Sequence, residues 1–205
     1  MHRTSPLLLT FRRARLAAPG APRVACLRVE TPVRQLLRRM ATDLEIVEAS
    51  LDDPTHTTAI VRLLDAYARE PMGIGRSLSD DVKANLIPGL RAQPNTLIFL
   101  AFIGREPAGV IVCFRGFSTF AARPVLNVHD LAVRPGFRGR RIGLALLRRV
   151  EERGLAMGCI KVTLEVREDN ESALKLYRRA GFAGDEPQES RPRTLFLEKE
   201  LPPTP

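Results

Sequence analysis

Between an apolar run and an amphipathic segment, this chain carries a basic loop with two glycines, Arg-Gly-Arg-Arg-Ile-Gly at residues 138–143. The apolar run ends at Val133, and the amphipathic segment extends from Leu144 to Met157. The first backbone N–H groups of a helix have no partner within the helix and lie at the positive end of its dipole. Glycines let the backbone approach a phosphate closely, and arginines add positive charge. The order of strand, loop and helix therefore predicts a site for a phosphate or pyrophosphate group.

Two well-known phosphate-binding loops do not fit these residues. A P-loop requires Gly-x-x-x-x-Gly-Lys followed by Ser or Thr, and the sequence contains no such run. A dinucleotide-binding turn requires Gly-x-Gly-x-x-Gly early in a βαβ unit, with an acidic residue about twenty positions later. The loop here lacks the third glycine and comes two-thirds of the way along the chain.

The loop resembles the Arg/Gln-x-x-Gly-x-Gly/Ala signature of the GNAT acetyltransferases, which bind acetyl-CoA, with Arg138 and Gly143 at its two ends. Arg141 stands where the signature has glycine, so the backbone must carry a side chain at that point. An arginine there can also strengthen the contact with phosphate. The resemblance implies acetyl-CoA as the co-substrate and implies no metal.

A second segment, from Asn170 to Phe182, is similar to the family pattern Asn-x-x-Ala-x-x-Leu-Tyr-x-x-x-Gly-Phe. The two motifs come in the family's order and spacing. The overall pattern of elements extends over residues 42–201, and the specific part of the resemblance covers residues 126–182. The chain is thus identified as a member of the GNAT superfamily by two independent motifs.

The resemblance implies the α/β (α+β) GNAT fold, a mixed and mostly antiparallel sheet of six to seven strands with a parallel central pair, and about four helices. Hydrophobic periodicity predicts strands at 44–49, 96–103, 108–114, 126–133, 161–166 and 194–199. It predicts helices at 55–69, from 79 to near 87, at 144–157 and from 172. The second helix is expected to end or kink near Ile87 because Pro88 lacks an N–H group, and residues 115–124 are expected to form a loop or an irregular edge.

Charge divides the chain into an extension and a domain. The formal net charge is +9, but residues 1–39 hold nine arginines, no lysine and one acid, so residues 40–205 are almost neutral. We expect residues 1–39 to be a disordered Arg-rich extension or the product of a misplaced start with Met40 as the true one, residues 40–201 to be the acetyltransferase domain, and 202–205 to be a tail. A targeting segment and a nucleic-acid-binding arm are weaker alternatives for the extension.

The cysteines and the apolar runs bear on location. Cys26, Cys113 and Cys159 have neither metal-ligand spacing nor a disulfide pattern, which indicates small core residues in a reducing compartment. No apolar run approaches the length of a membrane span. We therefore expect a cytoplasmic protein with no membrane partner and no nucleic-acid partner, and the resemblance also allows a homodimer.

By resemblance, three parts of the chain bind the co-substrate. Backbone groups of the motif strand pair with the pantetheine, the loop cradles the pyrophosphate, and two residues of the second motif flank the thioester. These predicted binding residues are Leu131, Ala132, Val133, Arg138, Gly139, Arg140, Arg141, Ile142, Gly143, Leu144, Asn170 and Tyr177.

Acetyl transfer requires a neutral amine and benefits from a proton donor for the leaving thiolate. Tyr177 is the predicted donor, because it matches the tyrosine of the family's Leu-Tyr motif, although it also belongs to an apolar helix face. Glu165, twelve residues before it, and Asp130 are the candidate bases. His129 and a water relay to a distant carboxylate remain open.

The predicted reaction is transfer of acetyl from acetyl-CoA to a primary amine of a small molecule or peptide, by direct attack in a ternary complex. Residues 67–78 and 116–124 are the expected acceptor segments, and neither has a readable specificity pattern. The alternative is a non-catalytic acyl-CoA-binding or regulatory module on the same fold, since a fold alone does not fix an activity.

Overall fold

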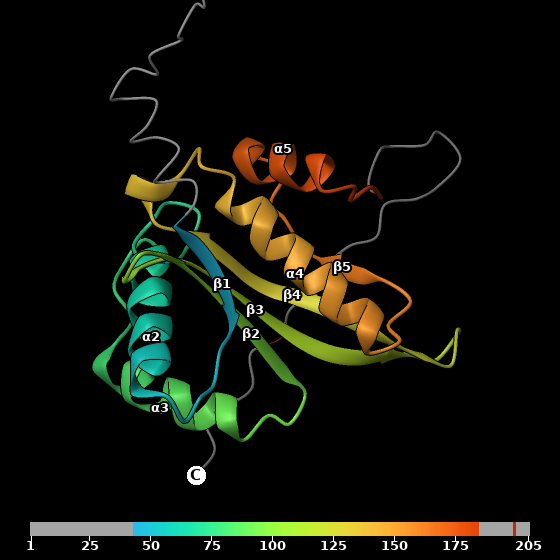
Figure 1. Ribbon diagram of the computed structural model, residues 1–205, viewed down its shortest axis with the longest axis horizontal. Helices are drawn as coiled ribbons and strands as arrows, with labels where there is room; N and C mark the ends of the chain where they lie inside the picture. The colour runs from blue at the N-terminus through green and yellow to red at the C-terminus, as the bar shows by residue number, and fades with distance from the viewer. Residues whose placement is uncertain (1–42, 185–198, 200–205) are drawn as a thin grey trace, which may run out of the picture.

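The computed structural model describes residues 43–184 and Lys199 (Figure 1). The described part forms one five-stranded sheet with helices on both faces. The strands are β1 (Leu44–Glu48), β2 (Thr96–Ile103), β3 (Glu106–Ser118), β4 (Arg123–Val133) and β5 (Val162–Leu164). The helices are α2 (Pro54–Ala68), α3 (Asp80–Arg91), α4 (Ile142–Ala156) and α5 (Glu171–Arg179), with a short 3-10 helix, η1 (Pro135–Phe137).

Local sequence explains where the first two helices begin. The Asp53 side chain accepts hydrogen bonds from the N–H groups of Thr55 and His56, and Pro54 occupies the first turn, where its missing N–H has no cost. The Ser79 side chain caps α3 in the same way by accepting from the N–H of Val82. Both caps satisfy N–H groups that the helix itself cannot pair.

The sheet runs in the order β1-β2-β3-β4-β5. The strands from β1 to β4 pair with one another in antiparallel fashion, and β5 pairs with β4 in parallel. Alternate residues of the central strands point to opposite faces, so the sheet has two apolar cores. Phe99 and Ile111 pack on the α4 side, and Leu100 and Val110 pack on the α2 side.

The contact between β4 and β5 is short. It consists of three residue pairs, the last of which joins Val128 to Leu164. The next β4 residue, His129, is an extra residue in a bulge, because Cys113 of β3 pairs with Val128 whereas Val112 pairs with Asp130. Pairing with β5 therefore ends where β4 changes its register, and the edge of β4 beyond the bulge has no neighbouring strand in the described residues.

The structure changes three of the sequence predictions. Helix α3 continues through Pro88 to Arg91, because Pro88 and Ala84, whose carbonyl loses its partner, are both exposed and water can satisfy that oxygen. Strands β3 and β4 extend through most of the predicted loop at 115–124 and leave only residues 119–122 as the turn. Strand β5 ends at Leu164 rather than at residue 166.

The predicted count of six to seven strands compares with five in residues 43–184. The expected strand at 194–199 lies, except for Lys199, outside the described residues. The parallel pair is present, but it lies at one end of this five-stranded order rather than at its centre. The GNAT architecture itself, a mixed and mostly antiparallel sheet with four α-helices, is confirmed.

Candidate functional site

The basic loop joins β4 to α4 and contains two residues in the left-handed backbone region. Gly139 has a φ of 76° and Arg141 a φ of 62°. This conformation costs a residue with a Cβ about 1–2 kcal/mol, which explains why glycine is the usual residue at the Arg141 position of the signature. The Arg141 side chain does not cap α4. The N–H groups of Ile142, Gly143 and Leu144 thus begin the helix without intrahelical partners, as the predicted phosphate site requires.

Gly143 has a packing role. A Cβ built on Gly143 would lie 2.9 Å from Cδ2 of Leu176 in α5, closer than real contacts of this kind. The absence of a side chain therefore lets α5 approach the first turn of α4. The two sequence motifs touch at this point, since Gly143 ends the first motif and Leu176 belongs to the second.

The edge of β4 beyond the bulge exposes backbone groups. The N–H of Arg134 donates to the carbonyl of Ala108 on β3, at 2.9 Å. Antiparallel pairing alternates, so Leu131 and Val133 turn their backbone groups away from β3, toward the side that β5 has left. The carbonyl of Val133 accepts a hydrogen bond from Nε of Arg138, at 2.9 Å. Ala132 pairs with β3 and buries its side chain on the α2 face.

The Arg138 side chain points back toward the sheet and α2. Its terminal nitrogen donates to Oε1 of Glu70 at 2.6 Å and also contacts Oε2 of Glu70. Arg134 and Arg140 lie against the ring of Phe137, with guanidinium carbons 5.1 and 5.3 Å from the ring centroid. The side chains of Arg134, Arg138 and Arg140 thus make contacts within the protein. The Arg141 side chain is exposed at the start of α4.

The bulge decides which way the candidate bases point. Val128 and Leu131 pack on the α4 side, whereas Ala132 is buried on the α2 side. The extra residue His129 puts Val128 and Ala132 on opposite faces, whereas simple alternation along the strand would have put them on the same face. Asp130 shares the face of Ala132. His129 is exposed, with its Nδ1 3.1 Å from Oδ2 of Asp130 and its ring edge-on to Phe114, 5.6 Å between centroids.

Tyr177 lies on α5 and is partly buried against the α4-side core, edge-on to Phe182 at 5.9 Å between ring centroids. Burial, with smaller contributions from Tyr67 and Asp130, raises the pKa of Tyr177 to about 12. The phenol therefore keeps its proton at neutral pH. Both interpretations of Tyr177, as a core residue and as a proton donor, agree with this position.

Tyr67, in the last turn of α2, faces the same region. Its hydroxyl donates to the carbonyl of Met72 at 3.3 Å. Burial raises the pKa of Tyr67, and the charges of Asp130 and Glu70 raise it further, while that of Arg167 lowers it. Sequence reasoning included Tyr67 and Glu70 only as members of the acceptor segment at 67–78 and missed Arg167, because no local pattern shows that these positions approach β4.

Glu165 and Asn170 lie in the segment between β5 and α5. Glu165 is exposed and comes directly after the end of β5, and it forms no hydrogen bond or ion pair with the described residues. The Asn170 side chain caps α5 by accepting from the N–H of Ala173 at 3.1 Å. Between them Arg167 forms a two-pronged ion pair with Asp169, at 2.9 and 2.6 Å. This pair raises the pKa of Arg167 and lowers that of Asp169.

The two expected acceptor segments differ in position. The loop from Arg69 to Ser79 adjoins Tyr67 and lies beside the candidate site. The turn after Ser118 lies at the opposite end of β4, since seven residues from Arg123 to Asp130 span roughly 23 Å of extended strand. This distance argues against the prediction that residues 116–124 form part of the acceptor site.

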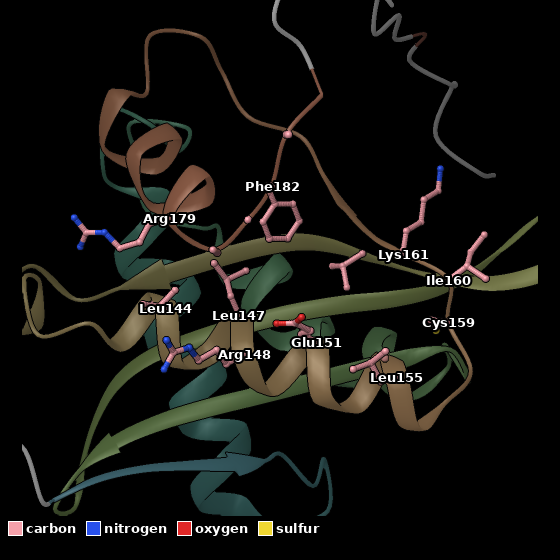
Figure 2. A pocket seen from close by; sticks show the side chains of 15 residues that line it. Leu144, Leu147, Arg148, Glu151, Leu155, Cys159, Ile160, Lys161, Arg179 and Phe182 are labelled. Atoms are coloured by element: carbon pink, nitrogen blue, oxygen red, sulfur yellow. The ribbon is translucent and has the colours of Figure 1, made fainter. Parts of the chain in front are cut away.

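A cavity in the described part lies elsewhere, between α4, β5 and the chain after α5, and has a volume of about 490 Å³ (Figure 2). Leu147, Leu155 and Phe182 line it together with charged side chains, among them Arg148 and Glu151. Of the predicted site residues, Leu144 alone lines this cavity. The open edge of β4 therefore lies outside this cavity.

Between residues 43 and 184, no helix is both long and apolar enough to cross a lipid bilayer. In the same part of the chain, no three His, Cys, Asp or Glu side chains are grouped so that they could hold a metal ion.

Comparison with known proteins agrees with this geometry. Residues 60–182 match the model of the acetyltransferase (GNAT) family. The chain is 40% identical over 83 residues to the N-alpha-acetyltransferase RimI of Mycobacterium tuberculosis, a match that covers 40% of this chain and 51% of the relative. The chain thus spans about half the length of the curated relative it matches.

Solved structures share the fold at lower identity. An aminoglycoside acetyltransferase from an uncultured soil metagenomic sample superposes with a TM-score of 0.61 at 21% identity, covering 75% of this chain and 97% of the other. The ribosomal-protein-alanine N-acetyltransferase of Brucella melitensis biovar Abortus 2308 gives a TM-score of 0.56 at 18% identity, covering 71% and 96%. These similarities concern the fold alone.

Proposed function

Because the chain belongs to the GNAT acetyltransferase family, we propose that it transfers the acetyl group of acetyl-CoA to a primary amine of a small molecule or peptide, by direct attack in a ternary complex. One observation carries the proposal. The open edge of β4 leads from the bulge at His129 to the unpaired N–H groups at the start of α4, and Tyr177 lies on the helix that packs there.

The residues along the open edge of β4 and at the start of α4 fit acetyl-CoA. The backbone N–H groups from Gly139 to Leu144 suit a pyrophosphate, because they are donors at the positive end of a helix. The backbone groups of Leu131 and Val133 suit the pantetheine amides, which pair as an added strand would. Acetyl-CoA supplies an activated acetyl group as a thioester.

The chemistry then needs two proton transfers. The amine nitrogen forms a bond to the acetyl carbon and loses a proton to a base, and the carbon–sulfur bond breaks. Tyr177, whose raised pKa keeps it protonated, donates to the departing sulfur. Asp130 and His129, 3.1 Å apart at the bulge, form the first candidate base, and Glu165 is the second.

The acceptor is proposed to be a peptide N-terminus before other amines. The supporting observation is the 40% identity over 83 residues to a protein named an N-alpha-acetyltransferase. The aminoglycoside acetyltransferase, at 21% identity, keeps small amines in the panel to be tested.

The first experiment measures thermal stability of the full chain with and without acetyl-CoA, and with ATP as the control ligand. Acetyl-CoA at about 100 times its dissociation constant should stabilise the fold by about 2.7 kcal/mol. A panel of peptides and aminoglycosides then tests turnover by release of free CoA. Binding without turnover on any amine would favour the non-catalytic acyl-CoA-binding module instead, and no binding would reject the proposal.

The base is tested by pH–rate profiles of Asp130→Asn and Glu165→Gln. Loss of the acidic limb of the profile in one variant identifies its carboxylate as the base, because that limb reports the group that must be deprotonated. Retention of the limb in both variants would point to a water relay.

A further inference from the structure

Arg138 connects two loops that are far apart in the sequence. It follows η1 in the basic loop, and its partner Glu70 follows α2, 68 residues earlier. The Glu70 side chain is only 22% exposed, so the ion pair is partly shielded from water. The same guanidinium also donates from Nε to the carbonyl of Val133, which ties the contact to the last residue of β4.

Glu70 is part of a well-ordered turn rather than a free side chain on a helix. Its N–H donates to the carbonyl of Tyr67 and its carbonyl accepts from the N–H of Gly73, both at 2.9 Å. The N–H groups of Ile74 and Arg76 both donate to the carbonyl of Ala68, at 3.0 and 3.2 Å. Movement of Glu70 therefore moves this whole turn.

Gly73 keeps the turn against the end of α2. A Cβ on Gly73 would lie 2.4 Å from the carbonyl oxygen of Tyr67, so the close approach requires glycine. The Tyr67 hydroxyl in turn donates to the carbonyl of Met72. The Glu70 backbone and the Tyr67 hydroxyl are thus hydrogen-bonded within one turn, and the charge of Asp130 contributes to the raised pKa of this phenol.

We propose that the Glu70–Arg138 ion pair couples binding of acetyl-CoA at the basic loop to the order of the turn at residues 70–76, which makes Glu70 a positioning residue for the acceptor amine. The inference rests on the proposed function. A ligand that fixes the Arg138 backbone increases the fraction of time in which the Arg138 guanidinium is paired with Glu70. The turn at residues 70–76 then gains order to the same extent. The acceptor then meets Tyr67 and its turn already in position.

Residue-resolved hydrogen exchange of the full chain, with and without acetyl-CoA, tests this coupling. In the native protein the amides of Gly73, Ile74 and Arg76 should exchange about fivefold more slowly when acetyl-CoA is bound, although the ligand contacts the other loop. In Glu70→Gln and Glu70→Ala this slowing should disappear, while the amides of the basic loop remain protected by the ligand.

The matched control is Glu48→Gln, which removes the carboxylate of another Glu–Arg pair, 3.2 Å from Nε of Arg153. Glu48 lies on β1, away from both loops, so the slowing at the turn should be unchanged in this variant. Thermal unfolding of each variant without ligand confirms that it is folded.

Each other outcome overturns the inference. If the turn is slowed equally in Glu70→Gln, or is not slowed in the native protein, the ion pair does not carry the coupling. If acetyl-CoA speeds exchange in the turn of the native protein, Arg138 leaves Glu70 for the phosphate, and the pair is a switch instead. If the basic loop gains no protection from acetyl-CoA, the proposed function fails as well, which separates that failure from the others.

Discussion

The two loops that frame the candidate site are built in opposite ways. The basic loop between β4 and α4 presents backbone N–H groups and has Gly139 and Arg141 in the left-handed region. Apart from the Arg138–Glu70 ion pair, the contacts of its arginines join residues that are close in sequence. The loop between α2 and α3 is held by a side chain from outside it. Asp65 accepts from Ser77 at 2.7 Å, from the N–H of Leu78 at 2.9 Å and from Arg69 at 2.5 Å.

This difference explains which loop can be recognised from sequence. A phosphate is bound by backbone N–H groups, and the backbone conformation that presents them can be recognised from the positions of glycine and arginine in the sequence. An acceptor amine is bound by side chains, and their arrangement depends on which elements meet in space. Each prediction below tests one side of this contrast.

The largest expected effect concerns catalysis next to the basic loop. Tyr177→Phe should lower kcat about 100-fold or more, since loss of a positioned acid costs that much. Affinity for acetyl-CoA should change little. The measurement is steady-state kinetics with the best acceptor from the panel, together with calorimetric binding of acetyl-CoA.

Tyr67→Phe is the control, because it removes a phenol of the same face that donates to Met72. Equal losses of kcat in Tyr67→Phe and Tyr177→Phe would mean that Tyr177 has no special place in proton transfer.

The next effect concerns packing behind the basic loop. Gly143→Val should destabilise the fold by about 1–3 kcal/mol, because the added Cβ lies 2.9 Å from Cδ2 of Leu176 and the branched side chain crowds that residue further. Urea unfolding measures the loss. Combining the change with Leu176→Ala should recover part of it, and a loss that stays the same in the double variant would show that α5 is not the cause.

On the acceptor side, Asp65→Asn should destabilise the protein by about 1–2 kcal/mol, because the amide cannot satisfy all the donors that point at the carboxylate. Hydrogen bonding from Ser77, first among several contacts, lowers the pKa of Asp65 to about 2. This carboxylate therefore stabilises the fold at pH values above its unfolded pKa, and the stabilisation disappears as the pH falls toward 2.

Unfolding of the native protein and of Asp65→Asn should accordingly differ at pH 7 and converge at about pH 2, as the linkage between ionisation and folding requires. A difference that stays constant over this range would assign the effect to shape rather than to charge.

The smallest expected effect is a gain. Arg141→Gly should raise stability by about 0.5–1 kcal/mol, because the relief of the left-handed conformation exceeds the entropy cost of glycine. Thermal unfolding measures it. The matched control is Ala122→Gly, because Ala122 is the other non-glycine residue with positive φ in the described part. It lies in a turn far from the open edge of β4.

The two glycine variants should differ in their affinity for acetyl-CoA. Arg141→Gly removes a charge from the phosphate site and should weaken binding, whereas Ala122→Gly should leave it unchanged. Equal affinity in both variants would mean that the Arg141 guanidinium makes no contact with the ligand.

The sequence predicted the structure correctly in those parts of the molecule that depend on short-range patterns. Strand β2 was predicted at 96–103 without error, α4 within two residues at each end and the start of α5 within one, because periodicity, caps and glycines act locally. The basic loop is recognisable for the same reason, since two of its residues only two positions apart, Gly139 and Arg141, both have the left-handed conformation.

Long-range pairing decided the rest. The extra residue at His129 exists only relative to β3, and it alone puts Asp130 and Ala132 on the face opposite to Val128. The contact of Glu70 with Arg138 joins positions 68 residues apart, and no local pattern encodes it. The sequence by itself determined the family and the position of the basic loop, because backbone conformation is a local property. The tertiary structure decided which side chains gather beside the open edge of β4, because register and loop contacts are properties of the folded chain.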